Sequence, residues 1–118
     1  MDPRQEIEQL TRKRDLLMEK HRDSLKLGLQ RYNEALAGQT TVLWKKHDFE
    51  SFASYYSLVD VEYVASLDAD YDGLSPKQKF FLIMEHMDKS ESEIQNALGV
   101  AEVTMRSIRS RIGKKHKA

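Results

Sequence analysis

The stretch SESEIQNALGVAEVTMRSIRSRI, residues 90–112, decides the fold. Ser90 and Glu93 form an S-x-x-E pattern, in which a hydroxyl caps a helix and the glutamate bonds back to the cap. The helix that they open has room for two turns before Gly99, a residue that readily takes the left-handed conformation that ends helices. A second helix is expected from about Ala101 to Ile112. A short helix, a glycine turn and a second helix form a helix-turn-helix motif.

One further helix is predicted directly in front of this motif. Ser75 can cap it, Pro76 suits its first turn, and Gln78 stands where it can bond back to the cap. Together the three helices can bury one small core. Its expected members are Leu74, Phe81, Met84, Met87, Ile94, Leu98, Val100, Met105, Ile108 and Ile112. We therefore delimit a helix-turn-helix domain at residues 74–118.

The second helix of such a motif lies in the DNA major groove. If Met105 and Ile112 face the core, the opposite side of that helix points outward. There, Arg106 is the best candidate for reading a guanine, because a guanidinium can bond O6 and N7 together. Lys89 and Ser90, at the start of the preceding helix, suit a phosphate. The candidate DNA-binding residues are Lys89, Ser90, Glu102, Val103, Arg106, Ser107, Arg109, Ser110, Arg111, Lys114 and Lys115.

Charge is distributed unevenly along a chain whose net charge is zero. Residues 1–38 carry eight basic and seven acidic groups. Residues 39–73 carry two basic and seven acidic groups, and residues 74–118 carry nine basic and five acidic groups. The three segments therefore have net charges of +1, −5 and +4. From Thr104 onward every charged residue is basic. A surface that binds phosphates has this character.

The basic end of the chain has two alternative interpretations. The cations can complement the negative end of a terminal helix. Arg109 and Arg111 can also pair within the chain, with Glu85, Glu102 or the acidic segment 60–72.

Residues 1–46 are predicted to form one long helix. Asp2-Pro3 offers a cap followed by a first-turn proline. Gly28 weakens the middle of this helix by roughly 1 kcal/mol relative to alanine. Apolar residues at heptad spacing begin at Ile7, and a second phase of the pattern continues to Leu36, as in a coiled coil with a stutter.

This apolar stripe is too long for the small C-terminal domain to cover. We therefore expect the helix to act as a dimerisation arm in a homodimer, with folding back onto its own chain as the alternative. The expected dimerisation residues are Ile7, Leu10, Leu17, Leu25, Leu29, Tyr32 and Leu36.

Residues 47–73 are predicted to form an aromatic linker helix, from about Asp48 to Leu67. Asp48 can cap it, and apolar residues recur at three- and four-residue steps. They are Phe49, Phe52, Tyr56, Val59, Tyr63 and Leu67. This stripe is expected to pack against the helix that follows Pro76, where Phe80-Phe81-Leu82-Ile83-Met84 is apolar on more than one face. The predicted fold class is thus all-α, a long N-terminal coiled-coil-like helix followed by a small helical bundle.

The C-terminal segment resembles a known family. Leu74-Ser75-Pro76, Ser92-Glu93-Ile94, Leu98-Gly99-Val100 and Thr104-Met105-Arg106-Ser107-Ile108 are similar to the LuxR-type C-terminal DNA-binding domain, which is related to region 4 of bacterial sigma factors. The flanking residues, from Tyr63 to Tyr71 and from Arg109 to Lys115, resemble regulators of Bacteroidetes in which sensor repeats, a membrane span and a coiled coil precede this module.

The resemblance implies a DNA-binding unit used as a dimer on paired half-sites. It also implies that the chain is the cytoplasmic end of a larger protein. By motif position, Arg106, Ser107 and Ser110 fall on base-facing sites, and Lys114 and Lys115 on the end that contacts the backbone. Ala101 stands where the family usually has a Ser or Thr cap.

Catalysis is not expected. His21, His47, His86 and His116 lack metal-ligand spacing, and the chain has neither a phosphate-cradling glycine loop nor a nucleophile elbow. No cofactor is expected. The absence of cysteine and of any long apolar run favours a cytoplasmic protein without membrane contact through this segment.

These features predict a sequence-specific, dimeric transcription regulator that binds double-stranded DNA through residues 101–112. The alternative is a helical protein-interaction adaptor, or a sigma-like promoter-recognition module, that does not bind DNA by itself. RNA polymerase is a further candidate partner.

Overall fold

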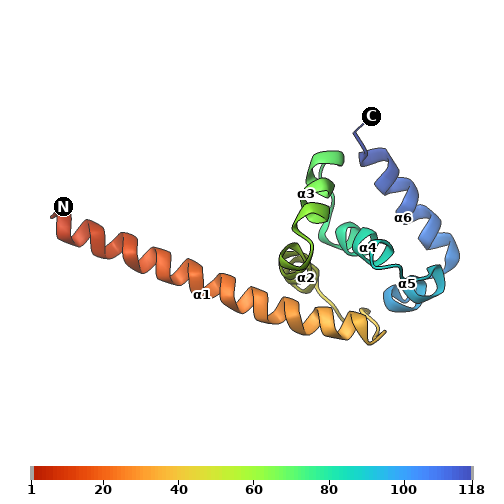
Figure 1. Ribbon diagram of the computed structural model, residues 1–118, viewed down its shortest axis with the longest axis horizontal. Helices are drawn as coiled ribbons and strands as arrows, with labels where there is room; N and C mark the ends of the chain where they lie inside the picture. Colours follow the sequence, from red (N-terminus) through yellow and green to blue (C-terminus); the bar gives the residue numbers. More distant parts are fainter. Residues whose placement is uncertain (1, 118) are drawn as a thin grey trace.

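The computed structural model describes residues 2–117, and within them it contains six helices and no strand. They are α1 (Pro3–Leu36), α2 (Lys46–Val59), α3 (Val61–Asp70), α4 (Pro76–His86), α5 (Glu91–Leu98) and α6 (Glu102–Lys115). Figure 1 shows α1 as a long rod and the other helices gathered at its C-terminal end. The predicted all-α class, with a long first helix and a small bundle, is confirmed. The predicted extent of that helix to residue 46 is wrong, because α1 ends at Leu36 and Gly38 takes the left-handed conformation, with φ 76°.

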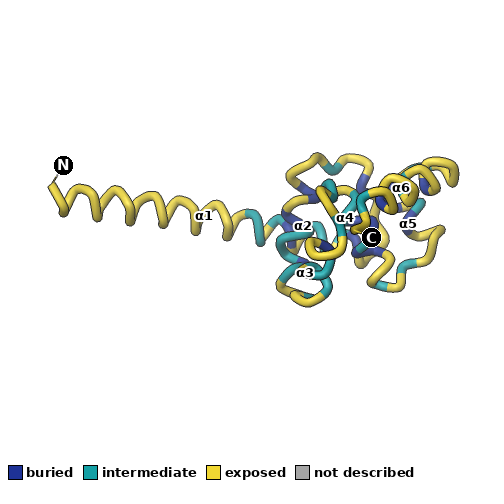
Figure 2. Tube along the Cα trace, turned by 90° about the horizontal axis from the view of Figure 1, so that it is seen from above, coloured by how far each residue is buried: buried dark blue, intermediate teal, exposed yellow. Residues whose placement is uncertain are grey.

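The long helix α1 has two parts with different surroundings. Asp2 caps it, because its carboxylate accepts a hydrogen bond from the backbone N–H of Arg4 at 3.1 Å. From there to Asp23 every residue is exposed, and this part projects from the bundle as an arm (Figure 2). We call residues 3–23 the arm. From Ser24 to Leu36 the same helix packs against α2.

The contact between α1 and α2 explains the glycine in the middle of α1. A Cβ on Gly28 would lie 2.1 Å from the carbonyl oxygen of Ser51, so only glycine allows the two backbones to approach this closely. On either side, the Ser24 and Ser51 hydroxyls are 3.0 Å apart, and Arg31 donates to Asp48 at 3.0 Å. Gly28 destabilises α1 as an isolated helix, but it allows α1 and α2 to cross at close distance.

The expected dimerisation residues fall into two groups. Ile7, Leu10 and Leu17 are 64%, 60% and 67% exposed and lie on the arm. In contrast, Tyr32 packs its ring against Phe52, Tyr55 and Tyr56 of α2, and Leu25 is half-buried. Leu29 and Leu36 stay exposed at the edge of the bundle. Some residues of the second phase of the apolar pattern therefore pack within the chain and are not free to contact a second copy.

The prediction of one linker helix from Asp48 to Leu67 is wrong, because the chain breaks at Asp60. Asp60 has φ −139° and ψ 82°, outside the helical region, and its carboxylate accepts from the backbone N–H of Tyr63 at 3.1 Å. It therefore caps a new helix, α3. Asp48 is also not a cap: it lies in the first turn of α2 and accepts from the backbone N–H of Lys45 at 2.7 Å.

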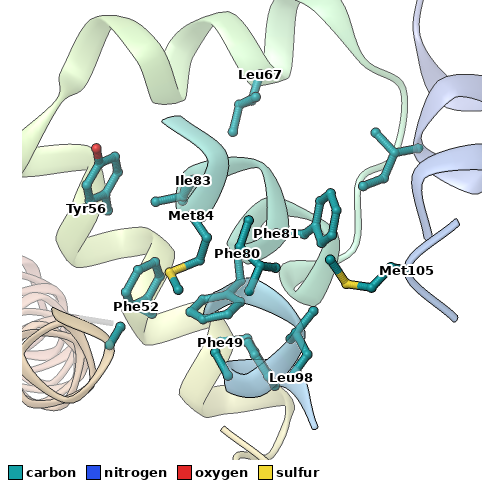
Figure 3. Packing of buried hydrophobic residues seen from close by; sticks show 14 residues of the cluster. Phe49, Phe52, Tyr56, Leu67, Phe80, Phe81, Ile83, Met84, Leu98 and Met105 are labelled. Carbon is teal, nitrogen blue, oxygen red and sulfur yellow. The ribbon is translucent and has the colours of Figure 1, made fainter. Parts of the chain in front are cut away.

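The core lies where α2 crosses α4. In Figure 3, Phe49 and Phe52 of α2 lie around Phe80. The ring centroid of Phe80 is 5.4 Å from that of Phe49 and 5.0 Å from that of Phe52. Trp44, in the loop before α2, adds a fourth ring at 5.3 Å from Phe80. The fully buried side chains are Phe52, Phe80, Phe81, Ile83, Met84, Ile94 and Met105. The predicted packing of the aromatic stripe on α4 is confirmed except at Val59, which is 48% exposed, and Phe80 and Ile83 were missing from the predicted core.

Among the residues described, no helix joins the length of a bilayer span to a sufficiently apolar composition.

Candidate nucleic-acid interface

Both predicted capping boxes are present, and they fix where α4 and α5 begin. The Ser75 hydroxyl accepts from the backbone N–H of Gln78 at 3.1 Å, and Gln78 Oε1 accepts from the backbone N–H of Ser75 at 2.9 Å. Ser90 and Glu93 repeat the arrangement at 3.1 and 2.9 Å. The Ser90 bonds hold the pKa of the Glu93 carboxyl below its usual value.

The turn between α5 and α6 has the predicted conformation. Gly99 is left-handed, with φ 63° and ψ 37°, and Val100 behind it is half-buried. Ala101 is extended and offers no side-chain cap to α6, so this helix starts at Glu102 without the bond that a hydroxyl would give. It ends at Lys115, three residues beyond the expected end at Ile112.

Helix α6 lies on the outer side of the bundle (Figure 1) and has one buried and one open face. Met105 and Ile112 are buried, and Ile108 is partly so. Three turns of the opposite face carry the exposed side chains of Val103, Arg106, Ser107, Ser110 and Lys114, and the exposed Arg111 lies at the edge of this face. The predicted division of this helix into a core face and an outer face is confirmed.

Arg106 points away from the core. Its side chain is 73% exposed, and its one ion pair among the described residues is with Glu102, one turn earlier, at 3.4 Å. An exposed pair of this kind is worth a fraction of a kcal/mol, so it does not hold the guanidinium in place.

Arg109 has a different role from Arg106. It donates to Glu91 at the start of α5, lies 3.7 Å from Glu85 of α4, and has its guanidinium 5.5 Å from the centroid of the Phe81 ring. The Glu91 bond raises the pKa of Arg109 above its usual value. This side chain connects three helices, so the alternative of pairing within the chain holds for Arg109.

Two of the candidate lysines are also engaged within the chain. Lys115 donates to the carbonyl oxygen of Gly73 at 2.9 Å and to Gln78 at 2.6 Å, which ties the end of α6 to the start of α4. Lys89 lies 3.8 Å from Glu93 and its side chain is only 18% exposed. With Glu91 and Glu93 in its first turn, the start of α5 is a poor place for a phosphate.

The acidic segment lies along the end of the chain and leaves the open face of α6 uncovered. The backbone N–H of Asp72 donates to the carbonyl oxygen of Lys115 at 2.8 Å, and that of Lys117 donates to the carbonyl oxygen of Asp70 at 2.8 Å. Between them, Tyr71 and His116 form an isolated antiparallel bridge. The Lys117 ammonium also lies 3.5 Å from the Asp72 carboxylate.

One cation beside α6 was not among the candidates. Lys77, in the first turn of α4, shares the lining of a hollow of about 240 Å³ with Arg111. Phe81 and Ile108 are among the apolar residues that line it. Lys77 follows directly after the Ser75-Pro76 start signal, but only the packing of α4 beside α6 shows that it borders α6.

The described residues contain no group of three or more His, Asp and Glu side chains that could hold a metal ion. Comparisons with protein-family models, curated proteins and solved structures found no match.

Proposed function

We propose that this protein is a DNA-binding transcription regulator whose α6 enters the major groove. The observation that carries the proposal is the open face of α6. It combines exposed arginine and lysine with two serines small enough for close approach, on a helix whose other side is anchored in the core. A recognition helix needs this combination of a fixed back and a polar, cationic front.

The side chains divide into base-reading and backbone-binding groups. Arg106 is the residue that reads a guanine edge, with Ser107 and Ser110 beside it. Arg111 and Lys114 contact phosphates, and Lys77 extends this cationic border onto α4. Arg109 and Lys115 position α6 through their bonds to α4 and α5.

The proposed regulator acts in the cytoplasm as a dimer. Two copies joined through their N-terminal arms offer two recognition helices to paired half-sites separated by whole turns of the duplex. RNA polymerase is then a candidate partner once the protein is bound beside a promoter.

Duplex binding at several salt concentrations tests the proposal. The full chain is compared with an Arg106→Ala/Arg111→Ala/Lys114→Ala variant. We expect the variant to lose affinity, and the slope of log K against log salt to fall by about two, one for each phosphate-binding cation removed from the interface.

The control removes the same charge elsewhere. Arg12, Arg22 and Lys26 are exposed on α1, outside the helix-turn-helix. An Arg12→Ala/Arg22→Ala/Lys26→Ala variant should keep the parent slope. Equal losses in both variants would mean non-specific attraction to the polyanion, and no salt-dependent binding by the parent chain would reject the proposal.

The second candidate function is a helical adaptor. Exposed apolar side chains near the turn of the motif favour it: Val42 is 62%, Leu43 is 89% and Val103 is 73% exposed. An adaptor would show no salt-dependent duplex affinity and no effect of the triple variant.

A further inference from the structure

The arm and the bundle contact of α1 use the same side of the helix. Counting from Ile7 in alternating steps of three and four residues gives one continuous seam: Ile7, Leu10, Arg14, Leu17, His21, Ser24, Gly28, Arg31 and Ala35. Steps of this size keep residues on one face of a helix. The last four lie against α2 or are buried next to it, whereas the first five are exposed on the arm.

Because the arm and the α2 contact share one side of α1, we infer that two copies pair through their arms in antiparallel orientation. The inference rests on the proposed dimeric regulator and specifies how its two copies meet. The occupant of the exposed seam is thus residues 3–21 of a second copy.

A parallel, in-register pair is excluded by the position of α2. Packed helices lie 8–10 Å apart, and α2 already occupies that space on the seam side at Gly28, where Ser51 touches the α1 backbone. In a parallel pair, each α2 would lie between the two α1 helices and collide with the partner's. An antiparallel pair that overlaps over residues 3–21 ends before either α2 is reached.

The seam residues match in one antiparallel register. With Leu10 of one arm level with Arg14 of the other, Ile7 meets Leu17 of the second copy, and each contact occurs twice. Apolar residues then cover one another at both ends, and the long stem of Arg14 lies along Leu10 with its guanidinium in water.

The charges beside the seam agree with this register. Glu6 and Lys20 flank the seam on the same side, and antiparallel packing brings Glu6 of one copy beside Lys20 of the other, twice. At the twofold axis, Lys13 of one copy comes near Lys13 of the other. Both lie on an exposed edge, where the repulsion between the two ammonium groups is a small effect. In a parallel pair, Glu6 and Lys20 would instead have Thr11 and Leu25 as cross-helix neighbours, without charge complementarity.

The register also fixes the distance between the two points where the arms enter their bundles. The two α1 positions at Ser24 are separated by about 24 helical residues, or about 36 Å.

Cysteine cross-linking tests the orientation, because the chain has no cysteine of its own. An Ile7→Cys copy mixed with a Leu17→Cys copy should form a mixed disulfide on mild oxidation. Leu17→Cys alone should not, because the two sites would be about 15 Å apart, beyond disulfide reach. Leu16→Cys, on the other side of the arm, is the matched control and should not link to Ile7→Cys.

Charge exchange tests the register independently by sedimentation equilibrium of the full chain. Glu6→Lys alone and Lys20→Glu alone should each weaken dimerisation, by about fivefold or more. The double variant should restore it.

Three results would overturn the inference. They are a monomer at every concentration, a Leu17→Cys homodimer that links faster than the mixed pair, and a stable dimer that links at none of these sites. None of them bears on DNA binding itself. A Leu10→Asp/Leu17→Asp variant should be monomeric yet still bind a single half-site, with about half the salt slope of the dimeric parent on paired half-sites, and this measurement separates the two proposals.

Discussion

Gly28 of α1 lies directly against Ser51 of α2, so close that a Cβ at position 28 would be 2.1 Å from the Ser51 carbonyl oxygen. The same Cβ would lie 2.6 Å from Cβ of Tyr55. Neither obstacle is the flexible end of a side chain. The two helices can therefore keep this crossing only while position 28 has no side chain.

Gly28→Ala should lower the free energy of unfolding by roughly 1–3 kcal/mol, even though alanine favours the helix itself by about 1 kcal/mol. Gly113→Ala is the matched control, because a Cβ on Gly113 of α6 meets nothing within 4 Å. It should raise stability by roughly 0.5–1 kcal/mol. Urea unfolding of both variants measures the two effects, and a stabilising Gly28→Ala change would contradict the tight crossing.

Acid should weaken the fold through Asp48. Its side chain is only 6% exposed; this burial alone would raise the pKa, but the Lys45 backbone N–H and the Arg31 guanidinium hold the pKa of Asp48 below its usual value. The unfolded carboxyl therefore binds its proton first, and stability falls as the pH drops below about 4.

Asp48→Asn should be less stable than the parent at neutral pH, and its stability should depend less on pH in the acid range. Free energies of unfolding measured from about pH 6 to pH 2 would show the two curves converging. Curves that stay parallel would mean that other carboxylates govern the acid transition.

A cap for α6 is the simplest stabilising change. Ala101 already has the extended conformation of a helix cap, with φ −77° and ψ 162°, but it has no side-chain acceptor. Ala101→Ser should raise the free energy of unfolding by about 1 kcal/mol. Ala101→Val keeps the acceptor absent and should give no gain, and thermal unfolding distinguishes the two.

The two arginines on α6 should respond differently to removal. Arg109→Ala breaks contacts with Glu85, Glu91 and Phe81, and should lower stability by about 1 kcal/mol. Arg106→Ala should leave stability within about 0.5 kcal/mol but weaken duplex binding. Unfolding and duplex titrations of both variants check this separation, which would be refuted if the two measurements changed together in both variants.

The sequence predicts local signals well in this chain. The caps at Ser75 and Ser90, the left-handed Gly99 and the two faces of α6 all depend on residues within a few positions of one another, and each is confirmed. A helix break at Asp60 was missed, because the apolar spacing continues across it. The backbone angles of Asp60 and the bonds from Tyr63 and His86 to its carboxylate show that the helix restarts there.

Long-range contacts account for the other differences. Arg109 and Lys115 are residue types that often contact DNA, but here they bond within the chain. Their hydrogen-bond partners lie 18 to 42 residues away in sequence. The burial of Tyr32 depends on where α2 crosses α1. No periodicity within α1 could show that its second apolar phase is shared between the bundle and solvent, or that Gly28 is a contact point.

Trp44 is the one tryptophan of the chain, and its ring centroid lies within 6 Å of those of Phe49, Phe52 and Phe80, with the Arg31 guanidinium 5.8 Å away. Its fluorescence should therefore report selectively on the junction of α1, α2 and α4. Emission that stays constant while a duplex is added would mean that the ligand leaves this junction undisturbed. The molecule thus carries an intrinsic optical probe that separates loss of the core from events on α6.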